Sequence, residues 1–337
     1  MPPLPPAAVE RFRDDVRVVM RYALDGPAPT DAVPTDAARF ALAVSGGADS
    51  MAMLLLAAAA FPGRVSVATF DHRLRAASAD EARLVADACA AVGVPHRILH
   101  AERPIAGSSI QSHARAARYA ALSRWAHDEG ICPLMTAHHA DDQAETLLMR
   151  LNRASGLAGL SGIRRTRPVD DVVIVRPLLG WRCAELRAIV EQAGIPFVDD
   201  PSNADPRHDR THARAALAAT PLLDPAALAA SAAYLSEAEE VVVRAAALLW
   251  SERWFGPERP FAIAGEPREL RRRLVRRAIA EARHHFAIVL PAFGDSSNVE
   301  ALIDALERGH GAVQGGVKVD VAPDGWLFRP APPRRSH

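Results

Sequence analysis

The stretch FALAVSGGADS (residues 40–50) decides the fold of this chain. Its first five residues form an apolar run with the length of a buried strand, and MAMLLLAAAA (residues 51–60) predicts a helix directly after it. The turn between them contains two glycines, which allow backbone amides to point toward a ligand. The sequence therefore predicts a strand, a tight turn and a helix whose N-terminus can bind an anion.

Four more apolar runs follow, separated by segments with the composition of helices. The runs are VSVATFD (residues 65–71), HRIL (96–99), PLMTAH (133–138) and VVIVRPLL (172–179). Apolar strands that alternate with amphipathic helices are typical of a parallel sheet covered on both faces. We therefore expect an α/β fold with a parallel five-stranded sheet flanked by helices. Ligands of such sheets bind at the carboxyl ends of the strands, where the polar motifs of this chain fall.

The organisation of the chain changes at both ends of this pattern. A helix (residues 9–24) and a connector rich in proline and aspartate precede it, which suggests a separate N-terminal part, residues 1–37. The strand–helix alternation stops after Gly194, and a polar linker leads into a mainly helical region. We expect a nucleotide-binding domain over residues 38–217 and a smaller, mainly helical domain over 218–337, with a small hairpin in its glycine-punctuated tail.

The composition excludes several classes of protein. The chain has 40 basic and 40 acidic residues, and its three cysteines form no CxxC motif, which argues against a zinc ribbon, a cysteine-ligated cluster or a disulfide scaffold. The single lysine is Lys318, so a lysine that clamps phosphate cannot lie in the first two hundred residues. Neither a signal peptide nor an apolar run of membrane-spanning length is evident, so we expect a cytoplasmic protein without a membrane partner.

The turn after the first strand is the sharpest functional signal. Its residues are Ser45, Gly46, Gly47, Ala48, Asp49 and Ser50. Backbone amides, two hydroxyl groups and a helix N-terminus together can hold pyrophosphate. The turn lacks the lysine of a GxxxxGK[ST] loop, which favours attack on the α-phosphate, hence adenylation, over hydrolysis of the γ-phosphate. The alternative is an ordinary strand-to-helix turn in which Asp49 is a helix-start acid.

A second polar cluster, TAHHADDQAET (residues 136–146), begins at the end of the fourth predicted strand. Asp142 and Glu145 are three positions apart, so both carboxylates lie on one face of the predicted helix. Two carboxylates beside ATP could hold Mg²⁺ or a substrate ammonium group. The alternative is an acid-rich first turn that complements the helix dipole. A zinc site is disfavoured because no third well-spaced protein ligand stands out.

Two further motifs lie near the ends of predicted strands. Arg115 and Arg118 share a face at the start of a helix, where they could stabilise charge on a phosphate, or could simply be solvated. Asp71 and His72 end the second strand, where a nucleotide base or ribose is expected, although Asp71 could instead cap a turn.

Arginine clusters elsewhere suggest contact with a polyanion, although runs of this density are commonly solvated faces with acidic partners. One cluster follows a glycine-rich turn, one lies in the linker after Gly194, and one crowds a single helix. Their residues are Arg164, Arg165 and Arg167; Arg207, Arg210 and Arg214; and Arg268, Arg271, Arg272, Arg273, Arg276 and Arg277.

The motifs together resemble a known family. SGGADS after FALAV resembles the PP-loop ATP pyrophosphatase superfamily. Five blocks within residues 38–214 are similar to the tRNA(Ile)-lysidine synthetases of that superfamily. Besides the turn, the blocks are FDHRLRAASADEA, QSHARAARYAAL, LMTAHHADDQAETLLMRLNRASGLAGLSGI and IVRPLLGWRCAELRAIVEQAGIPFVDDPSNADPRHDR. The last third of the chain resembles the family only weakly.

The resemblance implies a ligase that uses ATP and Mg²⁺. ATP would adenylate carbon 2 of the wobble cytidine in an isoleucine tRNA with a CAU anticodon, and free lysine would then displace AMP to form lysidine. Residues 45–50 would bind ATP, Arg118 would support the reacting phosphate, and Asp142 with Glu145 would hold lysine or Mg²⁺. Asp49 and Asp142 are the implied metal ligands, and a dimer is left open. The arginines expected to contact tRNA are Arg153, Arg164, Arg165, Arg207, Arg210, Arg272 and Arg273.

Some choices stay open at this stage. Either Asp142 or His139 could accept the proton that lysine must lose before attack. Phe70, Asn152 and His208 depart from the residues usual in the family, and the last two fall in segments expected to face tRNA. The alternatives in function are a tRNA thiolase, which the absence of CxxC disfavours, a PP-loop amide synthetase, and a non-catalytic nucleotide- or RNA-binding module.

Overall fold

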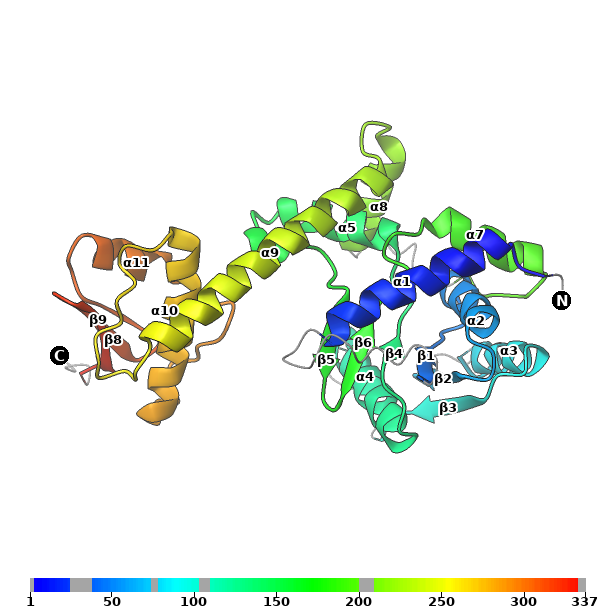
Figure 1. The fold of residues 1–337 in the computed structure, drawn as a ribbon, viewed down its shortest axis with the longest axis horizontal. Coiled ribbons are helices and arrows are strands. Elements are labelled where there is room, and N and C mark those ends of the chain that lie inside the picture. The colour runs from blue at the N-terminus through cyan, green and yellow to red at the C-terminus, as the bar shows by residue number, and fades with distance from the viewer. Residues whose placement is uncertain (1–2, 25–37, 74–77, 103–109, 200–208, 333–337) are drawn as a thin grey trace. The chain divides into compact units, whose positions relative to one another are not determined.

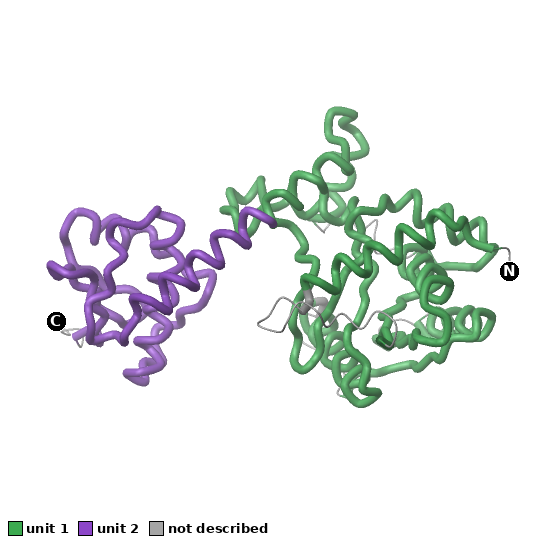
Figure 2. Tube along the Cα trace, in the orientation of Figure 1, with its two compact units in different colours: residues 1–236 green, residues 237–337 purple. Residues whose placement is uncertain are grey.

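The computed structural model describes residues 3–24, 38–73, 78–102, 110–199 and 209–332 (Figure 1). The chain forms two compact units, residues 1–236 and 237–337 (Figure 2). The division falls within helix α9 (Pro225–Arg253), C-terminal to the boundary near residue 217 that the sequence suggested. Helix α9 continues through this region because it contains neither glycine nor a proline after Pro225.

A six-stranded sheet forms the centre of unit 1, in the order β3-β2-β1-β4-β6-β5. The strands are β1 Phe40–Ala43, β2 Val65–Asp71, β3 His96–His100, β4 Leu134–Met135, β5 Thr166–Val169 and β6 Val172–Val175. The five predicted strands are all present and pair in parallel, which confirms the α/β fold class. Because the strands are parallel, their carboxyl ends meet at one edge of the sheet, where ligands of such folds bind.

The expected count of five strands was wrong by one. β5 pairs antiparallel with β6 and lies at the edge of the sheet, so the sheet has six strands and is mixed. Its sequence, TRPV, is not an apolar run and contains Pro168, which cannot donate a ladder hydrogen bond and is tolerated at a sheet edge. A short polar turn at Asp170 then leads into β6.

Helices cover both faces of this sheet. The helices that precede α9 are α1 Pro6–Leu24, α2 Ala48–Ala60, α3 Ser78–Ala91, α4 Ile110–Asp128, α5 Ala140–Leu151, α6 Leu157–Leu160, α7 Cys183–Ala193 and α8 Asp209–Ala219, of which α6 and α8 pack on α5. Successive residues of β1 face opposite sides: Phe40 and Leu42 join the apolar cluster of α1, α2, α3 and α7, whereas Ala41 joins the cluster of α4. The strand is therefore buried on both faces, as its continuous apolar run predicted.

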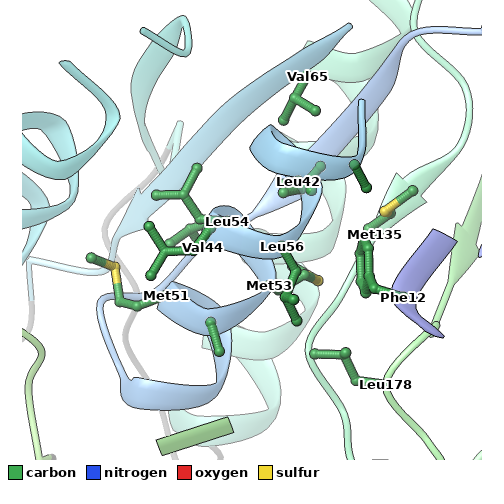
Figure 3. Packing of buried hydrophobic residues seen from close by; sticks show 14 of the residues in the cluster. Phe12, Leu42, Val44, Met51, Met53, Leu54, Leu56, Val65, Met135 and Leu178 are labelled. Carbon is green, nitrogen blue, oxygen red and sulfur yellow. The ribbon is translucent and has the colours of Figure 1, made fainter. Parts of the chain in front are cut away.

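The N-terminal helix is part of the core of unit 1. Phe12 is fully buried and packs among side chains of the sheet and α2, including Leu42, Met53 and Met135 (Figure 3). The indole Nε1 of Trp181, just before α7, donates a 2.8 Å hydrogen bond to Asp15 of α1. These contacts fix α1 against the sheet.

Unit 2 contains the end of α9, helices α10 (Arg268–His285) and α11 (Glu300–Glu307), and a small antiparallel sheet. Its strands are β7 Ala312–Gln314, β8 Val317–Ala322 and β9 Gly325–Pro330, in that order. The glycine-punctuated tail thus forms three strands where the sequence suggested a hairpin. Phe261, Ile279, Trp326 and Phe328 belong to the buried cluster that the helices and the sheet share. In neither unit does a described helix combine the length and the apolar character that crossing a membrane requires.

We predict that Phe12→Ala lowers the free energy of unfolding of unit 1 by about 3–5 kcal/mol, because a large cavity opens in the core. Val18→Ala on the same helix is the matched control, since Val18 is 43% exposed and should cost less than about 0.5 kcal/mol. Urea denaturation of both variants measures the difference. Equal losses would show that α1 does not contribute Phe12 to the core.

Candidate active site

The turn of residues 45–50 lies between β1 and α2, as predicted. The hydroxyl of Ser50 accepts from the Ser45 N–H at 3.1 Å and donates to the Gly47 carbonyl at 3.0 Å, which closes the turn on itself. Helix α2 starts at Ala48, and its N-cap residue, Gly47, has no side chain to cap the first amides. The free N–H groups and the helix dipole form a site for an anion.

Gly46 supplies the backbone geometry of this turn. Its φ of +90° is unfavourable for residues with a Cβ atom, and its carbonyl accepts a 2.9 Å hydrogen bond from the Val198 N–H. The segment before residue 200 is thereby tied to the turn. A side chain at position 46 would disturb both the turn and this link.

Three carboxylates surround the imidazole of His139, at the N-terminus of α5. Its Nε2 lies 3.4 Å from Asp49 Oδ2 and 3.6 Å from Asp142 Oδ2, and its Nδ1 lies 3.7 Å from Asp141 Oδ2. Burial disfavours the charged form, but the hydrogen bond to Asp49 and the three negative charges outweigh it and raise the pKa of His139 to about 9. His139 is therefore the counter-ion that holds these carboxylates together.

The preceding histidine has the opposite environment. His138 Nδ1 forms a hydrogen bond with Thr136 Oγ1, and the two atoms lie 3.1 Å apart. Burial lowers the pKa of His138 to about 3; the charge of Asp142 opposes this, and three arginines add to it. The arginines are Arg176, Arg115 and Arg118. The dipeptide of His138 and His139 thus separates an acidic region from a basic one.

The two predicted carboxylates of α5 do share a face. One guanidinium reaches both: Arg210 Nε lies 3.2 Å from Glu145 Oε2, and Arg210 Nη1 lies 3.9 Å from Asp142 Oδ1. Arg214 Nε donates to Glu145 Oε1 at 2.7 Å. Glu145 is almost fully buried, and burial raises its pKa although Arg214 and Arg210 act in the other direction. The sequence did not predict these partners, because α8 is distant along the chain.

Asp71 and His72 lie at the end of β2, as expected. Burial acts to raise the pKa of Asp71, but hydrogen bonds from Ser78 and from the Arg73 backbone outweigh it and lower the pKa. The Asp71 carboxylate therefore closes the turn after β2, the alternative role considered for it. The ring of His72 packs edge-on against Phe70, 4.8 Å away between centroids.

A third potential metal ligand joins Asp49 and His139. Cys183, the first residue of α7, completes a group whose ligand atoms lie within 4.8 Å of one another, the sole such triplet found in the described part of the chain. The sequence did not point to it. Burial and the charge of Asp49 raise the pKa of the Cys183 thiol to about 12, so the thiol stays protonated and donates to Asp49.

Two contacts fix α5 relative to α7. Arg182 forms a forked pair with Asp141, with N–O distances of 3.1–3.2 Å, and the Cys183 N–H donates to Asp141 Oδ2 at 2.8 Å. Asp141 is thus committed to positioning, whereas Asp49 and Asp142 have no contact with Arg182 among those described. Asp49 Oδ1 is buried without a hydrogen-bond partner among the described residues, so it can accept a bond from a ligand.

Comparison with known proteins adds to this geometry. The family model of the PP-loop domain matches residues 27–220. The chain is 42% identical over 301 residues to a tRNA(Ile)-lysidine synthase of Novosphingobium aromaticivorans, covering 88% of this chain and 90% of that protein. It is 40% identical to a tRNA(Ile)-lysidine synthase of Zymomonas mobilis, with coverage of 88% and 90%. The chain belongs to the tRNA(Ile)-lysidine synthase family.

A solved structure agrees with the fold. The U34-tRNA thiolase NcsA from Methanococcus maripaludis, determined with its [4Fe-4S] cluster, superposes with a TM-score of 0.52 at 17% identity. The match covers 68% of this chain and 79% of the thiolase. At this identity the likeness extends to the fold alone, whereas membership of the lysidine synthase family comes from the sequence relatives.

The arginines expected to contact tRNA have different neighbours in the structure. Arg153 pairs with Asp209, and the guanidinium of Arg165 stacks on the Tyr22 ring at 4.9 Å. The carbonyl of Arg164 accepts from Arg176 at 2.6 Å. Arg210 contacts the carboxylates of α5. Arg207 lies outside the described residues.

Arg272 and Arg273 of α10 are occupied by acids of unit 2. Arg272 pairs with Glu269 and Glu300, and Arg273 pairs with Glu269 and with the nearly buried Glu239 at 2.6 Å. The sequence raised acidic partners as an alternative to tRNA contact, and both side chains have them, although the side chains are only 26% and 18% exposed. Replacing Arg273 with an acid would leave Glu239 buried beside a like charge, so such a variant would report on folding before it reported on tRNA.

We predict that Gly46→Ala raises the Kd for ATP by about tenfold or more, because the new Cβ strains a backbone at positive φ and turns the amides away from the phosphates. Gly63→Ala is the matched control: Gly63 also has positive φ, +72°, but it lies before β2 at the opposite edge of the sheet, and a Cβ placed there would have no atom within 4 Å. The backbone strain of the two variants is therefore similar. Isothermal titration calorimetry with ATP should separate them, and equal Kd values would contradict the assignment of the turn.

Proposed function

We propose that this chain forms lysidine in tRNA(Ile), in two steps at one site. ATP adenylates carbon 2 of the wobble cytidine in a CAU anticodon, which releases pyrophosphate. The ε-amine of free lysine then attacks that carbon and displaces AMP. ATP use and the tRNA(Ile) substrate follow from the family to which the chain belongs. The role of each residue is our inference from the geometry.

One observation carries the proposal. Asp49, in the first turn of the helix that starts at the anion-binding turn, and Asp142 of α5 both lie within 3.6 Å of the same atom, His139 Nε2. The site for ATP phosphates and the carboxylates for an amine substrate therefore form a single centre. A reaction that joins an amine to a centre activated by ATP needs this juxtaposition.

Arg210 supports the role of Asp142 and Glu145 as a cation site. Its guanidinium lies between the two carboxylates, where a lysine ammonium would make the same kind of contacts. Because Glu145 is nearly buried and also paired with Arg214, we propose that lysine contacts Asp142 directly and shares Glu145 with the arginines of α8.

Asp49 and Asp142 also fit Mg²⁺. Carboxylate oxygens are the ligands that Mg²⁺ prefers, and Asp49 Oδ1 has no hydrogen-bond partner in the described part of the chain. A bound ion would offset the charge of the ATP phosphates. Through its Asp49 ligand it would be anchored at the start of α2, beside the turn that orients the pyrophosphate.

We propose that tRNA contacts Arg153, Arg164, Arg165, Arg207 and Arg210 of unit 1. Each is an arginine that could exchange its present contacts, where described, for phosphate oxygens. Arg272 and Arg273 would have to give up ion pairs with Glu269, Glu300 and Glu239, so we expect their share of tRNA binding to be smaller.

The test is incorporation of ¹⁴C-lysine into isoleucine tRNA with a CAU anticodon, in the presence of ATP and Mg²⁺. Label that requires ATP and resists mild alkali supports lysidine formation, and methionine tRNA with the same anticodon should remain unlabelled. If the tRNA binds but gains no label, and pyrophosphate is still released, the chain modifies the base with another nucleophile.

We predict that Asp142→Asn lowers kcat/KM for lysine by about 10- to 100-fold, because a charged hydrogen bond to the ammonium group is lost. Release of pyrophosphate in a single turnover with tRNA but without lysine should stay near the wild-type rate. Asp87→Asn, an exposed change on α3, is the control. An equal loss in both steps would instead mean that Asp142 acts through the metal.

A further inference from the structure

Three helices of unit 1 bring one potential metal ligand each to the same place. The ligands are Asp49 in the first turn of α2, His139 directly before α5 and Cys183 at the start of α7, and their ligand atoms lie within 4.8 Å of one another. The sequence disfavoured a zinc site because no third well-spaced ligand stood out. The fold supplies that ligand, Cys183, from a segment distant along the chain.

The spacing of these atoms fits a tetrahedral ion. Bonds of about 2.0 Å to oxygen and nitrogen and about 2.3 Å to sulfur place the ligand atoms of a tetrahedral zinc ion roughly 3.3–3.6 Å from one another. Asp49 Oδ2 and His139 Nε2 lie 3.4 Å apart, which is the separation of two such ligands. The sulfur of Cys183, within 4.8 Å of both, needs a shift of at most about 1–1.5 Å, which small rotations of the side chains supply.

The contacts between α5 and α7 hold the third ligand in position. The Cys183 N–H donates to Asp141 Oδ2 at 2.8 Å, and Arg182 is forked onto the same carboxylate. The imidazole of His139 is almost fully buried, whereas Asp49 and Cys183 are partly exposed, which gives an ion access from solvent. Asp49 Oδ1 also remains without a hydrogen-bond partner in the described part of the chain, although it is buried. The three ligands are therefore arranged before an ion arrives.

The chemistry of these ligands selects a transition metal over Mg²⁺. Mg²⁺ takes oxygen ligands and keeps several waters, whereas thiolate and imidazole suit Zn²⁺. Charge also favours the exchange. The imidazole of His139 and the thiol of Cys183 both carry a proton, and Zn²⁺ would displace one proton from each. The net charge beside the surrounding carboxylates is the same before and after, because two positive charges replace two protons.

We propose that Zn²⁺ binds to Asp49, His139 and Cys183 and thereby blocks the proposed magnesium site. The inhibitory effect rests on the proposed function, because Asp49 is also the proposed ligand of Mg²⁺. Binding of the ion does not depend on that function. Three protein ligands leave the fourth tetrahedral position to water. The thiol distinguishes this site from one made of carboxylates alone, and it provides the means to test it.

Absorption spectra with Co²⁺ test the site directly, because Co²⁺ accepts tetrahedral ligands like those of Zn²⁺ and its bond to a thiolate gives a charge-transfer band in the near ultraviolet. The variant is Cys183→Ser, and Cys132→Ser is the matched control, since Cys132 is an exposed cysteine outside the triplet. We expect the band in wild type and in Cys132→Ser, its loss when Zn²⁺ is added, and no band in Cys183→Ser. A band retained in Cys183→Ser would overturn the proposal.

The affinity for Zn²⁺ is measured by competition with a chromophoric chelator. Loss of one ligand should raise the Kd for Zn²⁺ by about 100-fold or more in Cys183→Ser and in Asp49→Asn, whereas Cys132→Ser should match wild type. Thermal unfolding without metal checks that each variant is folded. Asp49→Asn changes a partly exposed side chain, so it keeps the test decisive if Cys183→Ser does not fold. Equal Kd values in wild type and in a folded variant would contradict the site.

Inhibition connects the site to the reaction. Pyrophosphate release and lysine incorporation by wild type should fall as Zn²⁺ is added and recover with a chelator. Each variant is compared with its own rate without zinc, and Cys183→Ser should require about 100-fold more Zn²⁺ than wild type or Cys132→Ser. Zinc that binds to the triplet without slowing the reaction would contradict the inhibitory effect. Failure of wild type to form lysidine without zinc would count against the proposed function alone, because the cobalt spectra and the Kd for Zn²⁺ decide the site without it.

Discussion

The proposed active centre depends on the ion cluster around His139. Asp49, Asp141 and Asp142 come from two helices, and three carboxylates this close would repel one another strongly in a partly buried site. The imidazole between them supplies the compensating charge, and its raised pKa is the expression of that attraction. The arrangement brings the N-terminus of α2, which carries the proposed phosphate-binding turn, against the N-terminus of α5, which carries the carboxylates proposed to bind the substrate amine.

The neighbouring residue, His138, has the opposite electrostatic environment, because it lies close to positive charges. His138 stays neutral because it is buried and lies near three arginines, so the boundary between acidic and basic regions falls within one dipeptide at the end of β4. The proposed chemistry needs both regions. An ammonium group must be held beside carboxylates while negative charge on a phosphate is balanced by cations, and a short distance between the two lets the amine reach the activated carbon.

The sequence was sufficient for features that depend on neighbouring residues. The strand, turn and helix of residues 40–60 follow from one apolar pattern and two glycines, and the shared face of Asp142 and Glu145 follows from helix periodicity. Contacts between segments distant in sequence could not be predicted. The arginines of α8 on Glu145 and the thiol of Cys183 beside Asp49 depend on packing that no local pattern encodes. The edge strand β5 was missed for a related reason: with Pro168 in it, only its pairing with β6 makes it a strand.

The arginines show most clearly that contacts between distant segments cannot be predicted from local sequence. Density along the sequence singles out α10, yet there Arg268, Arg272 and Arg273 are paired with acids that the fold brings from α9, α10 and α11. Arg176 stands alone in the sequence and attracts no attention, but it is buried and has no carboxylate within ion-pair distance among the described residues. In a chain with equal numbers of acids and bases, the charge that matters for binding a polyanion is the charge left over after internal pairing. Among the described residues, that remainder includes Arg176, which follows β6 at the carboxyl edge of the sheet.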